Sequence, residues 1–221
     1  MITPTGHIPA ILEKQSEIRD VIICALSFMF FAFFVTASLP VKLLAFPSLI
    51  IVVAIISIEK NRDVLTAIFA TGNLFSLQKI SWYLVGILMG IAGSLFYRGS
   101  IGMPVFPDKV SVFAFLAILV GITEELIFRG FIQGRLTNLN ATFAIVFAAL
   151  AHALYKAFLF ISPWAQWHPG VLSFFLFSFG AFIVIGCLRQ FSKSMLPPIL
   201  VHAIFDLLVY AETVQAPWWV W

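Results

Sequence analysis

The six residues from Glu124 to Arg129 place two acids and one base in a stretch that is otherwise apolar. Residues 110–128 contain no charge other than these acids, and the run from Val112 to Gly121 is almost unbroken apolar sequence. A charged side chain at the centre of a membrane helix costs roughly 2.5–3.5 kcal/mol on insertion scales. Because three charges within six residues are expensive to bury, the cluster indicates a functional site.

Helix geometry separates the two acids of this cluster. Glu125 and Arg129 are four residues apart and share a helix face, so they can form an ion pair. Glu124 is turned by about 100° from Glu125 and faces elsewhere. His202 and Asp206 are also four residues apart, and we expect them on one face of a later helix.

The ionisable residues of three helices lie at similar depths. Glu124 and His152 each lie eleven residues from the inner ends of their expected spans, and His202 lies nine residues after Lys193, just before the last span. At a rise of 1.5 Å per residue these separations are about 16, 16 and 13 Å. We therefore expect the three side chains at one depth in the inner half of the membrane, and we hypothesise that their helices bring them around one pocket.

A glutamate, two histidines and an aspartate around one desolvated cavity favour hydrolysis. A partly desolvated carboxylate can act as a general base near neutral pH. Histidines can hold a water, donate to an oxyanion or bind a metal. No cofactor is obligatory in this hypothesis, but a divalent metal such as zinc is the alternative, with the ligands Glu124, His152, His202 and Asp206.

The composition is that of a multi-pass membrane protein. Of 221 residues, 62% are hydrophobic and 10% are charged, whereas soluble domains average about 25% charged residues. At about 20 residues per span, the length predicts an all-α bundle of seven or eight transmembrane helices, with the active site in the last four. The net charge of +3 is dispersed and does not indicate a nucleic-acid partner, and two cysteines exclude a disulfide framework.

Hydrophobic runs and breaker residues set the expected elements. We expect a single membrane domain, with N-terminal helices and a polar arm in 1–109, the helix core in 110–213 and a Trp-rich interfacial tail in 214–221. A re-entrant or interfacial helix at 64–78 is the candidate eighth span. The seven expected spans are about 21–39, 43–58, 80–97, 110–135, 141–160, 171–188 and 195–212.

Lysine and arginine positions predict the orientation. With seven spans and the N-terminus inside, eight of these residues fall on the inner side and three on the outer side. The count favours a cytoplasmic N-terminus in a cell membrane, and the short chain suggests a prokaryotic inner or plasma membrane. Lys156 is expected to extend toward the outer interface.

Three motifs in this region resemble a known family. Residues 124–129 have the pattern E-E-x-x-x-R, and the stretch from Met195 to Asp206 ends in H-x-x-x-D after a Leu-Pro pair. A third motif, F-x-x-x-H, is partly present, since position 148 is alanine and Phe147 comes one residue early. Residues 110–210 thus resemble the CAAX protease and bacteriocin-processing (CPBP, or Abi) family of intramembrane proteases, which includes the type 2 CAAX prenyl endopeptidases.

The resemblance implies roles for individual residues. Glu124 would activate water while His152 helps to hold it, and Glu125 with Arg129 would orient the site. His202 and residue 206 would stabilise the oxyanion. Many prenyl endopeptidases carry asparagine at the last position, so Asp206 would be protonated, orient His202 or bind a metal.

The predicted function is that of an intramembrane endopeptidase acting on a membrane-associated peptide or protein. Prenylated tails, bacteriocin leaders and transmembrane anchors are the candidate substrates. A proton-coupled transporter could use Glu124, His152 and Asp206 as a relay, although transporters usually show two related halves. A non-catalytic membrane immunity or binding protein with the same polar cluster is the third hypothesis.

Overall fold

The computed structural model describes residues 10–58, 76–165 and 170–213, and every regular element in these ranges is a helix. The all-α prediction is therefore confirmed for the described residues. The helices are α1 Ala10–Val35, α2 Leu39–Lys42, α3 Ala45–Ile58, α5 Leu77–Ser100, α6 Val112–Glu125, the π-helix η1 Leu126–Gln133, α7 Gly134–Thr137, α8 Ala141–Ile161, α9 Val171–Ser192 and α10 Leu196–Val209.

Four helices are long and apolar enough to cross a membrane. They are the Gln15–Val35 part of α1 and the whole of α5, α8 and α9. Shorter apolar helices occupy Leu39–Ile55 and Leu196–Val209. The structure is thus that of a multi-pass membrane protein, whereas the count of seven spans stays a prediction.

Polar side chains set several helix starts. The side-chain oxygens of Ser76, Ser111 and Asn140 accept hydrogen bonds from backbone N–H groups three residues later, at 3.4, 3.4 and 2.9 Å. Such caps satisfy N–H groups that have no partner within the helix. The caps begin α5, α6 and α8 close to the expected positions.

Some expected boundaries differ from the observed ones. The first span was expected over about 21–39 after a polar arm, but α1 begins earlier and runs unbroken from Ala10 to Val35. The last span was expected to reach residue 212, but α10 ends at Val209. Most of the helix expected at 64–78 lies outside the described residues, which resume at Ser76.

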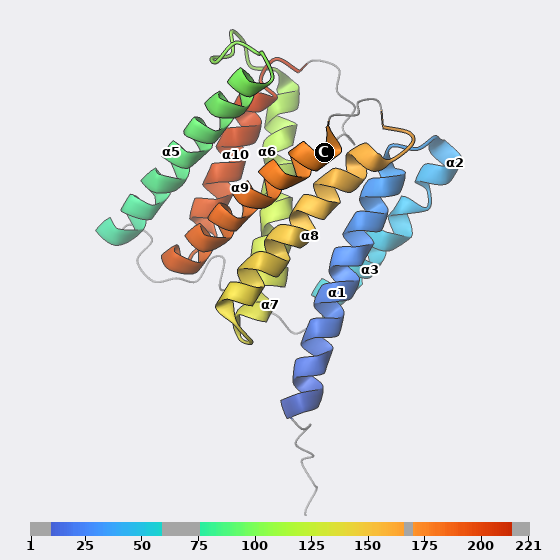
Figure 1. Ribbon diagram of the computed structural model, residues 1–221. Helices are drawn as coiled ribbons and strands as arrows, with labels where there is room; N and C mark the ends of the chain where they lie inside the picture. The colour runs from blue at the N-terminus through green and yellow to red at the C-terminus, as the bar shows by residue number, and fades with distance from the viewer. Residues whose placement is uncertain (1–9, 59–75, 166–169, 214–221) are drawn as a thin grey trace, which may run out of the picture.

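The helices that carry the expected site residues are neighbours in space. Figure 1 shows α8 between α1 and α9, with α5 and α10 side by side beyond α9. The α6 helix packs on α10, whereas its continuation η1 packs on α8. The acidic motif lies at the junction of α6 and η1, so it faces α8 on one side and α10 on the other.

Two glycines allow α5 to approach α10 closely. A Cβ at Gly86 would lie 2.7 Å from the backbone oxygen of Pro197, and one at Gly90 would lie 2.8 Å from that of Val201. Small residues at such crossings are typical of membrane helix pairs. This contact holds the α10 backbone next to α5 on the face opposite α6.

A buried arginine joins α5 and α10 at the other end of the pair. The Arg98 guanidinium donates to the backbone oxygens of Pro104 (2.7 Å) and Leu208 (2.9 Å) and to Glu212 Oε2 (2.7 Å). Glu212 Oε1 accepts from the backbone N–H of Asp108 at 3.1 Å. The hydrogen bond from Arg98 lowers the pKa of Glu212, so the carboxylate is the favoured form.

Candidate active site

The acidic motif lies where an α-helix changes into a π-helix. A single helix was expected over 110–135, but regular α-helix ends at Glu125 and residues 126–133 form η1. Residues 127–133 of η1 are all buried. Wide π turns within helices are rare and are frequently found at functional sites. No residue pattern in the sequence indicated this wider turn.

His152 connects the first acid to the arginine. Its Nε2 lies 2.9 Å from Glu124 Oε2, and its Nδ1 contacts Nη1 of Arg129. A guanidinium can only donate hydrogen bonds, so Nδ1 must accept. Nε2 then carries the ring proton and donates to Glu124. This tautomer holds Glu124 as a hydrogen-bond acceptor, which favours its carboxylate form.

The second acid connects the arginine to the other histidine. Arg129 Nε lies 3.4 Å from Glu125 Oε2, so the expected ion pair within the helix is confirmed. His202 Nδ1 lies 2.8 Å from Glu125 Oε1, and its Nε2 lies 3.5 Å from Glu124 Oε2. These contacts close a circuit that we call the polar ring, made of Glu124, His152, Arg129, Glu125 and His202. All five side chains are buried.

Two phenylalanines fix the plane of His152. The ring of Phe182 stacks on one side at a centroid distance of 3.7 Å, and that of Phe128 stacks on the other at 4.1 Å, both within 7° of parallel. Sequence reasoning missed both roles. The phenylalanine expected four residues before His152 is replaced by the fully buried Ala148. Phe128 could have been recognised, because it lies inside the first motif.

Lys156 corrects an expectation. It was expected to extend toward the outer interface, but its Nζ donates to Glu124 Oε1 at 2.7 Å. The spacing of four residues from His152 gives both side chains the same face of α8, and this was the available signal. Glu124 therefore accepts hydrogen bonds at both carboxylate oxygens and is not a free carboxylate.

Asp206 lies beside the polar ring, as its spacing from His202 predicted. Its Oδ2 is 3.7 Å from His202 Nε2. A Cβ at Gly121 would lie only 2.5 Å from Asp206 Oδ2. The glycine in α6 therefore makes room for the aspartate of α10, and both helices are needed to position it.

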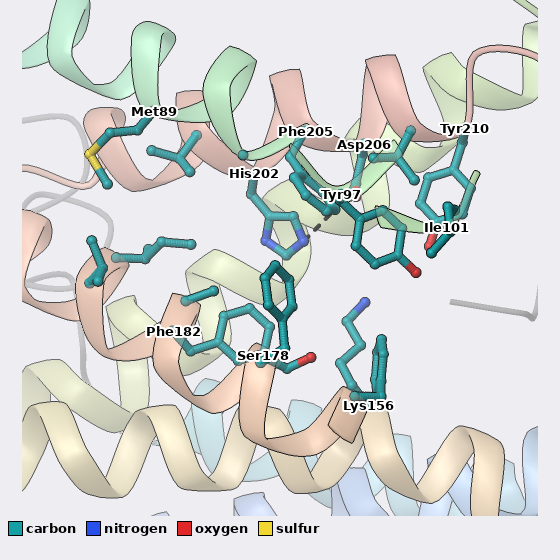
Figure 2. A pocket seen from close by; sticks show the side chains of 18 of the residues that line it. Met89, Tyr97, Ile101, Lys156, Ser178, Phe182, His202, Phe205, Asp206 and Tyr210 are labelled. Carbon is teal, nitrogen blue, oxygen red and sulfur yellow. Dashed lines mark ion pairs between the residues drawn. The ribbon is translucent and has the colours of Figure 1, made fainter. Parts of the chain in front are cut away.

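A cavity of about 580 Å³ opens between α5, α8, α9 and α10. Figure 2 shows His202 and Asp206 on one wall, with Lys156 rising from α8 toward them. Most of the other lining side chains are apolar. Glu124 and His152 are not part of the lining and lie behind Lys156. The cavity thus has an apolar body with a charged wall, as a site for an amphipathic ligand requires.

The four candidate metal ligands do not form a metal shell. In the described parts of the chain, no group of three or more His, Cys, Asp or Glu side chains is arranged to hold a metal ion. Both oxygens of Glu124 are hydrogen-bonded to protein cations or N–H groups, and one partner is the Lys156 ammonium. This donor set does not fit a divalent cation as it stands.

The fold and the site define a helical membrane protein with a buried carboxylate–imidazole centre next to an apolar cavity. Residues 104–208 match the family model described as Type II CAAX prenyl endopeptidase Rce1-like. The match spans the helices that carry the polar ring, and it confirms the resemblance that the motifs indicated. No curated protein and no solved structure matches the chain significantly.

Proposed function

We propose that this protein is an intramembrane endopeptidase that uses Glu124 to activate water. The observation that carries the proposal is the hydrogen bonding of Glu124, whose Oε2 faces the Nε2–H of His152 at 2.9 Å. That tautomer supplies a donor to the carboxylate, so Glu124 is held in its ionised form, and each oxygen keeps a further lone pair that can take a proton. The match of residues 104–208 to a prenyl endopeptidase family supports the reaction class.

The proposed reaction is hydrolysis of a peptide bond. Glu124 takes a proton from water as its oxygen bonds to the carbonyl carbon, and the carbonyl π electrons move onto oxygen. The carbon–nitrogen bond then breaks, and the proton on Glu124 passes to the departing amine. His152 orients Glu124 throughout, while the ion pair of Glu125 and Arg129 holds His152 and His202 in place.

The cavity supports a membrane-associated substrate. Its walls are mainly apolar, and its polar groups lie together at the end nearest the polar ring. A peptide with a lipid or an apolar segment can bury that part in the cavity while its backbone meets the charged wall. The Asp206 carboxylate, 3.7 Å from His202 Nε2, would orient this imidazole toward the peptide.

The test uses purified protein in lipid nanodiscs and three probes. They are a peptide ending in a farnesylated cysteine and three further residues, the same peptide without lipid, and a synthetic single-span helix. Mass spectrometry identifies products. Glu124→Gln should lower the rate at least about 10²-fold, because a general base contributes this much or more, while Glu212→Gln should cleave as the wild type does.

Two further comparisons test for a metal-dependent reaction and for the absence of peptidase activity. A zinc chelator should leave cleavage unchanged, whereas loss that added zinc restores would identify a metal-dependent reaction. Cleavage that persists in Glu124→Gln, or the absence of any product from the wild type with all three probes, would contradict the endopeptidase proposal. Thermal unfolding of each variant in detergent shows whether it retains its fold.

A further inference from the structure

Lys156 separates the proposed base from the cavity. Its ammonium lies 2.7 Å from Glu124 Oε1, and its side chain is 14% exposed and lines the cavity. Among the described lining residues it is the only lysine or arginine. A peptide entering the cavity therefore meets the ammonium before it meets the carboxylate.

Three other ionisable side chains near Lys156 and Glu124, namely His202, Asp206 and His152, are poorly suited to stabilise an oxyanion. His202 Nε2 lies between Glu124 Oε2 at 3.5 Å and Asp206 Oδ2 at 3.7 Å, so a proton there has two carboxylates as acceptors. Asp206 has no proton to donate when ionised. The Nε2–H of His152 is directed at Glu124.

Lys156 has the donors that these groups lack. An ammonium carries three protons, and one of them is used by Glu124. Figure 2 shows its nitrogen pointing into the open space that His202, Asp206 and Tyr97 face. Donors placed in advance where negative charge develops are worth far more in a water-poor site than in water.

The local charge balance also favours a cation at this position. Glu124, Glu125 and Asp206 are three carboxylates, against which Arg129 and Lys156 supply two permanent positive charges. Attack by water moves the negative charge of Glu124 onto the substrate oxygen, because Glu124 becomes neutral as it takes the proton. Without the lysine, that oxyanion would form beside the Glu125 and Asp206 carboxylates with Arg129 as the one permanent cation near them.

We propose that the Lys156 ammonium donates to the scissile carbonyl and stabilises the oxyanion that forms there, an inference that rests on the proposed endopeptidase function. As Glu124 takes the proton from water and the new carbon–oxygen bond forms, the displaced π electrons collect on the carbonyl oxygen. This oxygen accepts a hydrogen bond from Lys156. When the carbon–nitrogen bond breaks, the electrons return to restore the carbonyl, and the amine leaves with the proton from Glu124.

The first test compares three variants on whichever of the three probes the wild type cleaves. Lys156→Met should lower kcat about 10²–10³-fold, the usual loss when one oxyanion donor is removed, while KM changes much less. Lys156→Arg keeps charge and donors and should lose far less activity. Lys193→Met, outside the cavity, should behave as the wild type.

The second test measures binding and not turnover. It therefore still gives a result if Lys156→Met alone fails to fold. Glu124→Gln removes one negative charge. The double variant Glu124→Gln/Lys156→Met removes one negative and one positive charge. A phosphinate analogue of the cleaved probe should bind the double variant about 10²-fold more weakly than it binds Glu124→Gln. The uncleaved probe should bind both nearly equally.

The outcomes separate the two proposals. If the wild type cleaves no probe, the endopeptidase proposal and this inference fail together. If the wild type cleaves a probe but Lys156→Met keeps its kcat, only the role of Lys156 is overturned. Equal binding of the phosphinate to the two Glu124→Gln proteins would also overturn it.

Discussion

The contact between α5 and α10 gives a prediction with a control in the same helix. Gly90→Ala adds a methyl group 2.8 Å from the backbone oxygen of Val201 and 2.9 Å from Cβ of Ile204. Gly93→Ala, less than one turn later, adds the same group 3.7 Å from Phe205, which is an ordinary contact. Both variants gain the same helix propensity, so the difference between them isolates the steric effect.

The structure sets the size of this difference. Ordinary van der Waals contact begins near 3.4 Å, so the methyl group at position 90 must gain about 0.6 Å from a backbone atom that cannot rotate away. Insertion of a methylene into a well-packed region typically costs about 1–3 kcal/mol. At about 2–4 °C per kcal/mol for a chain of this size, Gly90→Ala should unfold several degrees below Gly93→Ala.

Thermal unfolding of the purified proteins in one detergent, followed by intrinsic tryptophan fluorescence, measures this difference. Activity should fall along with stability in Gly90→Ala, because α10 carries His202 and Asp206. Equal unfolding temperatures for Gly90→Ala and Gly93→Ala would show that α5 and α10 are not in close contact at this point, and the position of the α10 residues would need another explanation.

Two further predictions concern Gly121 in α6 and Glu212, which follows the end of α10. Gly121→Ala should reduce cleavage sharply, because its methyl group would occupy the place of Asp206 Oδ2. Gly180→Ala is the control and should cleave normally, because no atom lies within 4 Å of the added methyl group. Equal activities of the two variants would refute this prediction. The pKa of Glu212 is lowered by Arg98, so its stabilisation is present at neutral pH and lost as pH falls through that lowered value. Glu212→Gln should therefore unfold at a lower temperature than the wild type at neutral pH, and the gap should close in acid; a gap independent of pH would contradict the assignment.

Much of the site could be predicted from spacing alone. The separation of four residues predicted the pair of Glu125 with Arg129 and the proximity of His202 to Asp206, and both are observed. Equal depth was consistent with the hypothesis that Glu124 and both histidines share one pocket, and Glu124 Oε2 lies 2.9 and 3.5 Å from their Nε2 atoms. The pairs within one helix follow from helix periodicity, which depends on sequence separation and little else.

Other features could not be predicted, because they depend on contacts between helices. The stacking of Phe182 on His152 joins α9 to α8, and no spacing rule connects positions 30 residues apart. The prediction for Lys156 was wrong because it assumed that a lysine in an apolar helix extends to the interface, as such lysines usually do. Here the Nζ of Lys156 instead lies 2.7 Å from the buried carboxylate of Glu124, on a neighbouring helix.

The π-helix also makes the site sensitive to chain length. The extra residue of a π turn lets Glu125 end a regular helix while Arg129 still reaches both Glu125 and His152. Deleting one residue after Arg129 would let the segment relax into an ordinary α-helix, which would change the directions in which the side chains of residues 126–133 point. Variants that differ in length between 130 and 133 should therefore be rarer among functional sequences than substitutions there.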